Sequence, residues 1–164
     1  MGNFSWQVPT HYNIGIDACD RWADGSGRLA LIEEVAGETK HYSFDQLKDY
    51  SNQMANTLQA AGVKQGDRVG ILLTQSLATG IAHLATYKLG AIAVPLFALF
   101  GLDALSYRIS HADIGVIITD DGGFDKLKAI RDEIPCLKTI FNVNQEHSDE
   151  SSLSFWSELA KQPA

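Results

Sequence analysis

Few chemistry-bearing residues in this sequence have the spacing of a known kind of site. Asp120-Asp121-Gly122-Gly123 could begin a helix whose free amides bind an anion, but two carboxylates would repel one. Ser110-His111-Ala112-Asp113 contains a Ser, a His and an Asp, yet neighbours on one helical turn cannot align as nucleophile, base and orienting acid. We therefore expect an ordinary turn at the first segment and a helix end at the second.

Other catalytic machinery is also not evident. The sequence contains no G-x-x-x-x-G-K-[ST] phosphate loop, and no G-x-G-x-x-G run follows a strand-like segment. His11, His41, His83 and His147 have no metal-ligand spacing with a cysteine or with one another. The carboxylates are dispersed and form no evident general-acid pair. From the residues alone we therefore predict a folded domain, and we assign no catalytic residue and no metal site.

The composition is typical of one soluble globular domain. A chain of 164 residues is too short for two ordinary domains, and its formal charge of -7 with scattered Lys and Arg argues against a nucleic-acid partner. Cys19 and Cys136 lie far apart and are expected to stay reduced, as in a cytoplasmic protein. No signal peptide is evident, and the longest apolar stretch, residues 91–102, is too short to span a membrane.

The first third of the chain contains signals for short local elements. Residues 14–23 are expected to form a short helix, and residues 29–35 and 39–42 to form a β-hairpin. Ser43 and Gln46 have the spacing of a capping box. Apolar residues then recur every three or four positions up to Gly62, which predicts one amphipathic helix.

From residue 66 onward, strand-like and helix-like segments alternate with short links. The expected strands are 68–73, 91–96, 116–119 and 139–143, and the expected helices are 76–89, 102–111 and 123–133. The polar stretch 144–152 is expected to be a loop, followed by a short helix around residues 155–159. This alternation predicts an α/β fold, a mainly parallel sheet with helices on both faces, plus the N-terminal hairpin.

Four motifs occur in order on the expected elements. The first is Tyr42-Ser43-Phe44-Asp45-Gln46-Leu47, and the second is Gly66-Asp67-Arg68-Val69. The third is Tyr87-Lys88-Leu89-Gly90-Ala91-Ile92-Ala93-Val94-Pro95-Leu96, and the fourth is Tyr107-Arg108-Ile109-Ser110-His111-Ala112-Asp113. In this order they resemble the first core motif, the turn into the first core strand, the second core motif and the following helix end of the adenylate-forming (AMP-binding) superfamily. The order and intervals agree from about residue 5 to residue 143, and the segment 95–101 looks closest to the bacterial acyl-CoA synthetases of that superfamily.

The resemblance implies a reaction and a set of substrates. A carboxylic acid attacks ATP in the presence of Mg²⁺ to give an acyl-adenylate and pyrophosphate, and coenzyme A then displaces AMP. The segment 95–101 looks closest to synthetases acting on acetate, propionate or medium-chain acids. In such enzymes catalysis is chiefly positioning and electrostatic stabilisation of phosphate charge.

The resemblance also implies that this chain is an N-terminal part of such an enzyme. The family's phosphate loop, adenine-stacking strand, ribose-binding Asp and C-terminal Lys are not found within residues 1–164. We expect one α/β subdomain, truncated before the ATP phosphate-binding loop, that is inactive alone and binds no cofactor tightly. Its expected parts are 1–43 (helix and hairpin), 44–143 (core) and 144–164 (loop and short helix). A surface left open by the truncation is expected to favour self-association.

One binding role could lie within the chain. In related ligases an Arg on the helix after the Val-Pro strand contacts the nucleotide phosphate of coenzyme A, and Arg108 has the matching position. The alternative is a solvated helix arginine, or one paired with Asp103 or Asp113. Phe97, Phe100 and Gly101 could line the pantetheine or acyl tunnel; the alternative for them is core packing.

Two other functions remain open at this stage. A natural, non-catalytic relative could serve as a binding or scaffold protein. A stand-alone flavodoxin- or receiver-like module with Asp120 as an acidic acceptor is the other possibility, but the segment Thr74-Gln75-Ser76 lacks the carboxylates that a receiver needs after its first strand.

Overall fold

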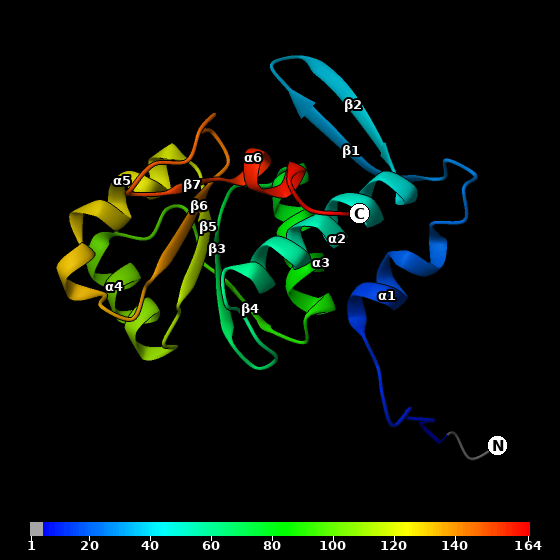
Figure 1. The fold of residues 1–164 in the computed structure, drawn as a ribbon, viewed down its shortest axis with the longest axis horizontal. Helices are drawn as coiled ribbons and strands as arrows, with labels where there is room; N and C mark the ends of the chain where they lie inside the picture. Colours follow the sequence, from blue (N-terminus) through cyan, green and yellow to red (C-terminus); the bar gives the residue numbers. More distant parts are fainter. Residues whose placement is uncertain (1–4) are drawn as a thin grey trace.

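The computed structural model describes residues 5–164, which form a three-layer α/β fold with a separate N-terminal hairpin (Figure 1). The central sheet has five parallel strands in the order β4-β3-β5-β6-β7. These strands are β3 (Arg68–Leu72), β4 (Ile92–Pro95), β5 (Val116–Thr119), β6 (Thr139–Asn142) and β7 (Leu153–Ser154). The predicted α/β class and parallel sheet are confirmed.

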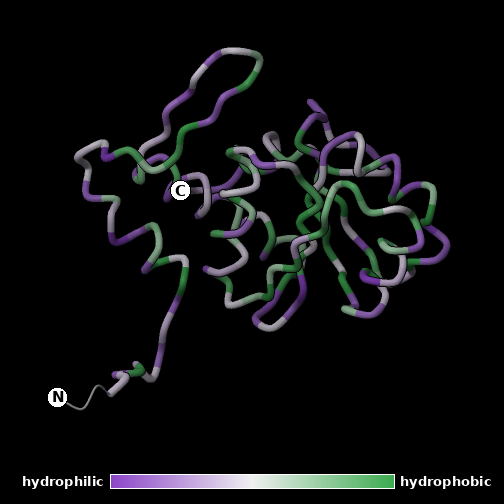
Figure 2. Tube along the Cα trace, turned by 180° about the vertical axis from the view of Figure 1, so that it is seen from behind, coloured by the Kyte–Doolittle hydropathy of each residue, from purple (hydrophilic) through white to green (hydrophobic). Residues whose placement is uncertain are grey.

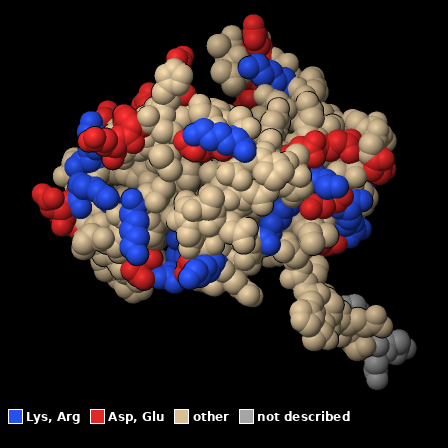
Figure 3. Space-filling model, viewed as in Figure 1, with Lys and Arg blue, Asp and Glu red and all other residues tan. Residues whose placement is uncertain are grey.

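Helices cover both faces of this sheet, as expected. On one face lie α2 (Phe44–Ala60), α3 (Leu77–Lys88) and α6 (Phe155–Ala160), and on the other lie α4 (Leu102–His111) and α5 (Asp121–Ala129). The hydropathy colouring in Figure 2 shows the apolar strands running between the two layers. On the face shown in Figure 3, Lys and Arg side chains lie close to Asp and Glu side chains.

The alternation of side chains along each strand builds two hydrophobic cores. Val69 and Ile71 of β3 face α2 and α3, whereas Leu72 faces α4 and α5. Ile118 and Ile117 of β5 divide between the two cores in the same way. Strands buried on both faces read as continuous apolar runs, which is why the sequence predicted them.

The hairpin consists of β1 (Leu29–Val35) and β2 (Glu38–Ser43), paired antiparallel. Ala36 and Gly37 at its turn both have positive φ, 52° and 84°, the backbone of a type I′ turn that suits the twist of a hairpin. Glu33 Oε1 accepts a hydrogen bond of 2.8 Å from the backbone N–H of Leu77 at the start of α3. This bond ties the projecting hairpin to the body.

The predicted capping box is present at the start of α2. The Ser43 hydroxyl accepts from the N–H of Gln46 at 3.2 Å, and the Gln46 side chain accepts from the N–H of Ser43 at 2.9 Å. Gly62 follows the helix with φ of 91°, a conformation that only glycine adopts without strain. The helix therefore begins and ends where the sequence indicated.

Several strand ends differ from the prediction by one residue, and the larger differences lie at the N-terminal helix, at α5 and at β7. The N-terminal helix is divided into α1 (Ile14–Ala18) and a 3₁₀ turn, η1 (Asp20–Trp22), because Cys19 leaves the helical conformation with φ of -128°. Helix α5 ends at Ala129, and a second 3₁₀ turn, η2 (Arg131–Glu133), follows it. The short strand β7 was not predicted; it lies between the expected loop 144–152 and the expected helix around 155–159.

Candidate functional site

The candidate site is the turn that connects β4 to α4, residues 96–101, at the carboxyl edge of the sheet. Ligands of open α/β sheets bind outside this edge. The N–H of Leu96 donates to the carbonyl of Ile71 at 2.9 Å, which continues the β3–β4 pairing by one bond. The N–H of Phe100 then donates to the carbonyl of Phe97 at 2.9 Å and closes a tight turn.

The two aromatic residues of the turn are in contact. The Phe97 and Phe100 rings lie edge to face, with centroids 5.8 Å apart and planes at 74°. Phe97 is 60% exposed, whereas Phe100 is half-buried against the core of α4 and α5. The alternative of core packing therefore explains the position of Phe100 in part, and it does not explain the exposed position of Phe97.

Arg108 of α4 stacks on the Phe100 ring of this pair. Its guanidinium carbon is 4.2 Å from the centroid of the Phe100 ring, and Nη1 donates to the carbonyl of Ala104 at 3.1 Å. Asp113, one of the alternative partners, is instead paired with Arg68 at 2.7 Å. Among the described residues Arg108 forms no ion pair, and it is exposed, so most of its five N–H donors have no protein partner there.

Gly101 is the N-cap residue of α4, with φ of -71° and ψ of 171°. It offers no side chain to cap the helix, and a Cβ built on it would meet no atom within 4 Å. The space beside the start of α4 is therefore open. The structure thus brings Phe97, Phe100, Gly101 and Arg108 into one neighbourhood.

One residue of this neighbourhood was missed from the sequence. Lys126 of α5 reaches the turn, and its Nζ donates to the carbonyls of Ala98 at 2.6 Å and Phe100 at 3.1 Å. A lysine on an amphipathic helix carries no signal that it will bond to a turn more than twenty residues earlier in the chain. Only the packing of α5 beside α4 reveals it.

The two segments weighed as alternative sites have structural roles. Asp120 caps α5 by accepting from the N–H of Gly123 at 2.8 Å, so this segment is an ordinary turn. In the other segment, Ser110 donates to the carbonyl of Glu133 and His111 stacks on Tyr107. The Ser, His and Asp of that helix end thus have separate partners, and no triad forms.

A model of the AMP-binding enzyme family matches residues 19–164 of the chain. The chain belongs to the AMP-binding enzyme family. The acetyl-coenzyme A synthetase of Streptomyces coelicolor is 39% identical over 126 residues, which cover 75% of this chain and 19% of that protein. The acetyl-coenzyme A synthetase of Bacillus subtilis is 31% identical over 153 residues, which cover 92% of this chain and 26% of that protein.

Solved structures of AMP-binding relatives show the same fold. The anthranilate CoA ligase AuaEII, in complex with anthranoyl-AMP, matches with a TM-score of 0.83 and 26% identity, over 95% of this chain and 28% of that one. An acyl-CoA synthetase of Brucella canis matches with a TM-score of 0.83 and 26% identity, over 94% of this chain and 29% of that one. The chain therefore spans about a fifth to a quarter of the curated relatives described above.

The strand order of the central sheet also occurs outside the AMP-binding family. The order β4-β3-β5-β6-β7 is equivalent to 2-1-3-4-5, which flavodoxin-like sheets also have. Strand order alone would not separate an AMP-binding enzyme from a flavodoxin- or receiver-like module. The family match over residues 19–164 favours the former, as the ordered motifs predicted.

Within residues 5–164 no group of three or more His, Cys, Asp or Glu side chains is placed to hold a metal ion, and we assign no ligand to Mg²⁺ there. Cys19 is also unsuited to nucleophilic chemistry, because burial raises its thiol pKa to about 11.

No helix in the described part of the chain is both long and apolar enough to cross a bilayer.

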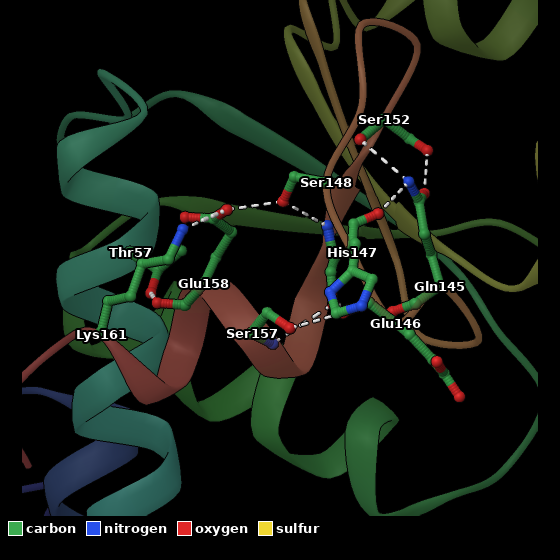
Figure 4. A network of polar contacts seen from close by, with 10 residues as sticks. Thr57, Gln145, Glu146, His147, Ser148, Ser152, Ser157, Glu158 and Lys161 are labelled. Atoms are coloured by element: carbon green, nitrogen blue, oxygen red, sulfur yellow. Dashed lines mark hydrogen bonds and ion pairs between the residues drawn. The ribbon is translucent and has the colours of Figure 1, made fainter.

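A polar network anchors the last part of the AMP-binding chain (Figure 4). Ser148 Oγ donates to Glu158 Oε1 at 2.6 Å, and Lys161 Nζ donates to the same oxygen at 2.8 Å. Both bonds lower the pKa of Glu158 below its usual range, and the bond from Lys161 has the larger effect. Thr57 of α2 donates to the backbone carbonyl of Glu158 at 3.4 Å. The network holds the loop after β6 against α6 and α2, a structural role.

Proposed function

We propose that the chain is the N-terminal α/β part of an acyl-CoA synthetase. The complete reaction joins a carboxylic acid to coenzyme A. The carboxylate oxygen attacks the α-phosphorus of ATP and pyrophosphate leaves; the coenzyme A thiol then attacks the acyl carbon and AMP leaves. The observation that carries the proposal is the family match over residues 19–164, together with the gathering of Arg108, Phe97, Phe100 and Gly101 beside α4.

Within this function, Arg108 contacts the nucleotide phosphate of coenzyme A. The stacking of its guanidinium on Phe100 at 4.2 Å limits the side chain's freedom while most of its donors remain available. A planar guanidinium suits bidentate contact with a phosphate. Phe97 and Phe100 supply apolar wall for the pantetheine or acyl chain, and Gly101 leaves room for the ligand beside the start of α4.

Titration of the ¹⁵N-labelled chain with coenzyme A tests this role. We expect weak binding that shifts the Arg108 Nε–H and Gly101 amide signals, with smaller shifts from 3′-dephospho-coenzyme A. Arg108→Ala should weaken binding up to about fivefold, as for an exposed charge pair. Arg28→Ala is the matched control, because Arg28 also stacks on an aromatic ring, that of Trp22 at 4.5 Å, in the N-terminal segment. Equal shifts from both ligands, or equal weakening by both variants, would contradict the assignment.

The 164 residues alone are proposed to lack adenylation activity. They contain no phosphate-binding loop motif, and they span about a fifth to a quarter of the curated relatives. Exchange of labelled pyrophosphate into ATP, measured with acetate, propionate and medium-chain acids, is expected to stay at background. Acid-dependent exchange by the purified chain would show that it carries the adenylation chemistry itself.

We also propose that the isolated chain self-associates through the apolar surface of β4 and the turn after it. Ile92, Phe97, Leu99 and Leu102 are all exposed along this segment. Pro95 has no N–H to offer a further strand, so the association relies on side chains rather than on sheet extension. Sedimentation velocity should show a concentration-dependent dimer that Leu99→Glu weakens; a monomer at all concentrations would contradict this.

A further inference from the structure

The turn after β4 presents apolar side chains to solvent yet has a defined shape. Leu99 at its tip is 81% exposed and Phe97 is 60% exposed, so burial of these side chains contributes little to the order of the turn. Within the turn one backbone hydrogen bond, from Phe100 to Phe97, closes the chain. The core packing of Phe100 and its ring contact with Phe97 hold side chains of the turn and leave its carbonyl groups to other partners.

Lys126 is such a partner, and it lies on a different helix. Its Nζ donates to the carbonyl oxygens of Ala98 and Phe100, at 2.6 and 3.1 Å, and these two residues flank Leu99. An ammonium group has three donors and no acceptor, so one group can serve both carbonyls at once. Hydrogen bonds from a charged donor are shorter and stronger than neutral ones.

Phe100 is the residue that connects Lys126 with Arg108. Its backbone carbonyl accepts from Lys126, and its ring also packs on the core of α4 and α5. The Phe97 ring packs against that ring edge to face, and the Arg108 guanidinium stacks on it at 4.2 Å. Lys126 itself does not touch Arg108 in any of these contacts. It acts on the arginine only through the turn.

We propose that Lys126 is a positioning residue that orders the 97–101 turn and thereby places Phe100 and Arg108 for coenzyme A. The proposal rests on the function proposed above for Arg108. The ordering of the turn, however, can be measured without any ligand. Loss of the lysine should free the turn, reorient the Phe100 ring and weaken coenzyme A binding while the sheet stays intact.

The same helix offers a matched control. Lys128 lies one residue beyond Leu127, is exposed, and has its Nζ 4.0 Å from Asp125 and 5.2 Å from the Phe124 ring. It donates to no carbonyl among the described residues. Lys128→Met therefore removes the same charge and keeps a similar stem without touching the turn.

Amide hydrogen exchange and coenzyme A titration of the ¹⁵N-labelled chain test the proposal on Lys126→Met, Lys126→Arg and Lys128→Met. We expect Lys126→Met to speed exchange of the Phe100 amide by about tenfold or more, move the Arg108 Nε–H signal and weaken coenzyme A binding severalfold. Lys126→Arg should restore all three because a guanidinium can bond to both carbonyls. Lys128→Met should change none of them.

Two results would overturn the proposal. The first is unchanged Phe100 exchange and an unchanged Arg108 signal in Lys126→Met. The second is unfolding, or faster exchange across the whole sheet, in that variant, since this would give Lys126 a general structural role. If the unsubstituted chain does not respond to coenzyme A at all, the role of Arg108 is refuted, while the exchange data still decide whether Lys126 orders the turn.

Discussion

The Nζ of Lys88 lies 2.7 Å from Oδ1 of Asp20, and the two side chains are only 9% and 19% exposed. Lys88 is the last residue of α3, and Asp20 begins the η1 turn. Nζ also donates to Asn52 Oδ1 of α2 at 2.6 Å. The buried Asp20 Oδ1 receives no hydrogen bond of normal geometry from the described residues, so the contact is an ion pair. It joins the N-terminal segment to two helices.

Removal of one partner of this pair should destabilise the protein strongly. Lys88→Met leaves a largely buried carboxylate uncompensated, which we expect to cost about 3 kcal/mol in the free energy of unfolding measured with urea. The neighbouring pair of Arg21 and Asp17 is about half exposed, and Arg21→Gln should change stability by less than about 1 kcal/mol. Equal losses from the two variants would show that burial does not distinguish the pairs.

The two glycines Gly70 and Gly80 should respond oppositely to alanine. A Cβ on Gly70 of β3 would lie 2.8 Å from Ile117 Cγ1 and 3.2 Å from Ile114 Cγ2. This overpacking of the core that the sheet shares with α4 and α5 should cost about 1–3 kcal/mol in Gly70→Ala. A Cβ on Gly80 of α3 meets only Leu31 Cδ1, at 3.5 Å, so Gly80→Ala should stabilise by about 0.5–1 kcal/mol. Thermal unfolding of both variants checks the signs; a stabilised Gly70→Ala would disprove the packing argument.

Features set by neighbouring residues were predictable from the sequence. The Ser43–Gln46 capping box and the buried strand after Arg68 follow from local hydrogen bonding and from hydrophobic pattern. Strand β7 has two residues, too few to show a period. Its pairing with β6 accompanies two bonds to the intervening loop: the Ser154 hydroxyl donates to the carbonyl of Gln145 at 2.7 Å, and the Ser154 N–H donates to Ser148 Oγ at 3.0 Å.

Some features of the candidate site were likewise predictable from the sequence, and others were not. Arg108 was found through the family resemblance, and Phe100 through its place just after the Val-Pro strand. Their stacking was not predicted, since it depends on how the turn is held. The bond from Lys126 to the turn, like the ion pair of Lys88 with Asp20, joins distant parts of the chain. The residue types alone contain no information about which distant group they will meet.

The stability of the protein should fall on mild acidification, and His83 should account for part of the fall. His83 is half-buried on α3, where its Nδ1 lies 3.2 Å from the Tyr87 hydroxyl, and burial lowers its pKa below the ordinary value of 6.5. In the unfolded chain the pKa returns toward 6.5, so between the two values the unfolded state binds more protons. Stability must then rise with pH through this window and be lost as the pH falls below about 6.5.

Urea unfolding of the protein and of His83→Gln from pH 5 to pH 7.5 measures this contribution. The slope of stability against pH should be smaller in His83→Gln, because glutamine does not titrate. His11, His41, His111 and His147 are exposed and remain in both proteins, so their contribution cancels in the comparison. A parallel pair of curves would mean that His83 titrates alike in the folded and unfolded states, and a steeper curve for His83→Gln would mean that its folded form prefers the proton.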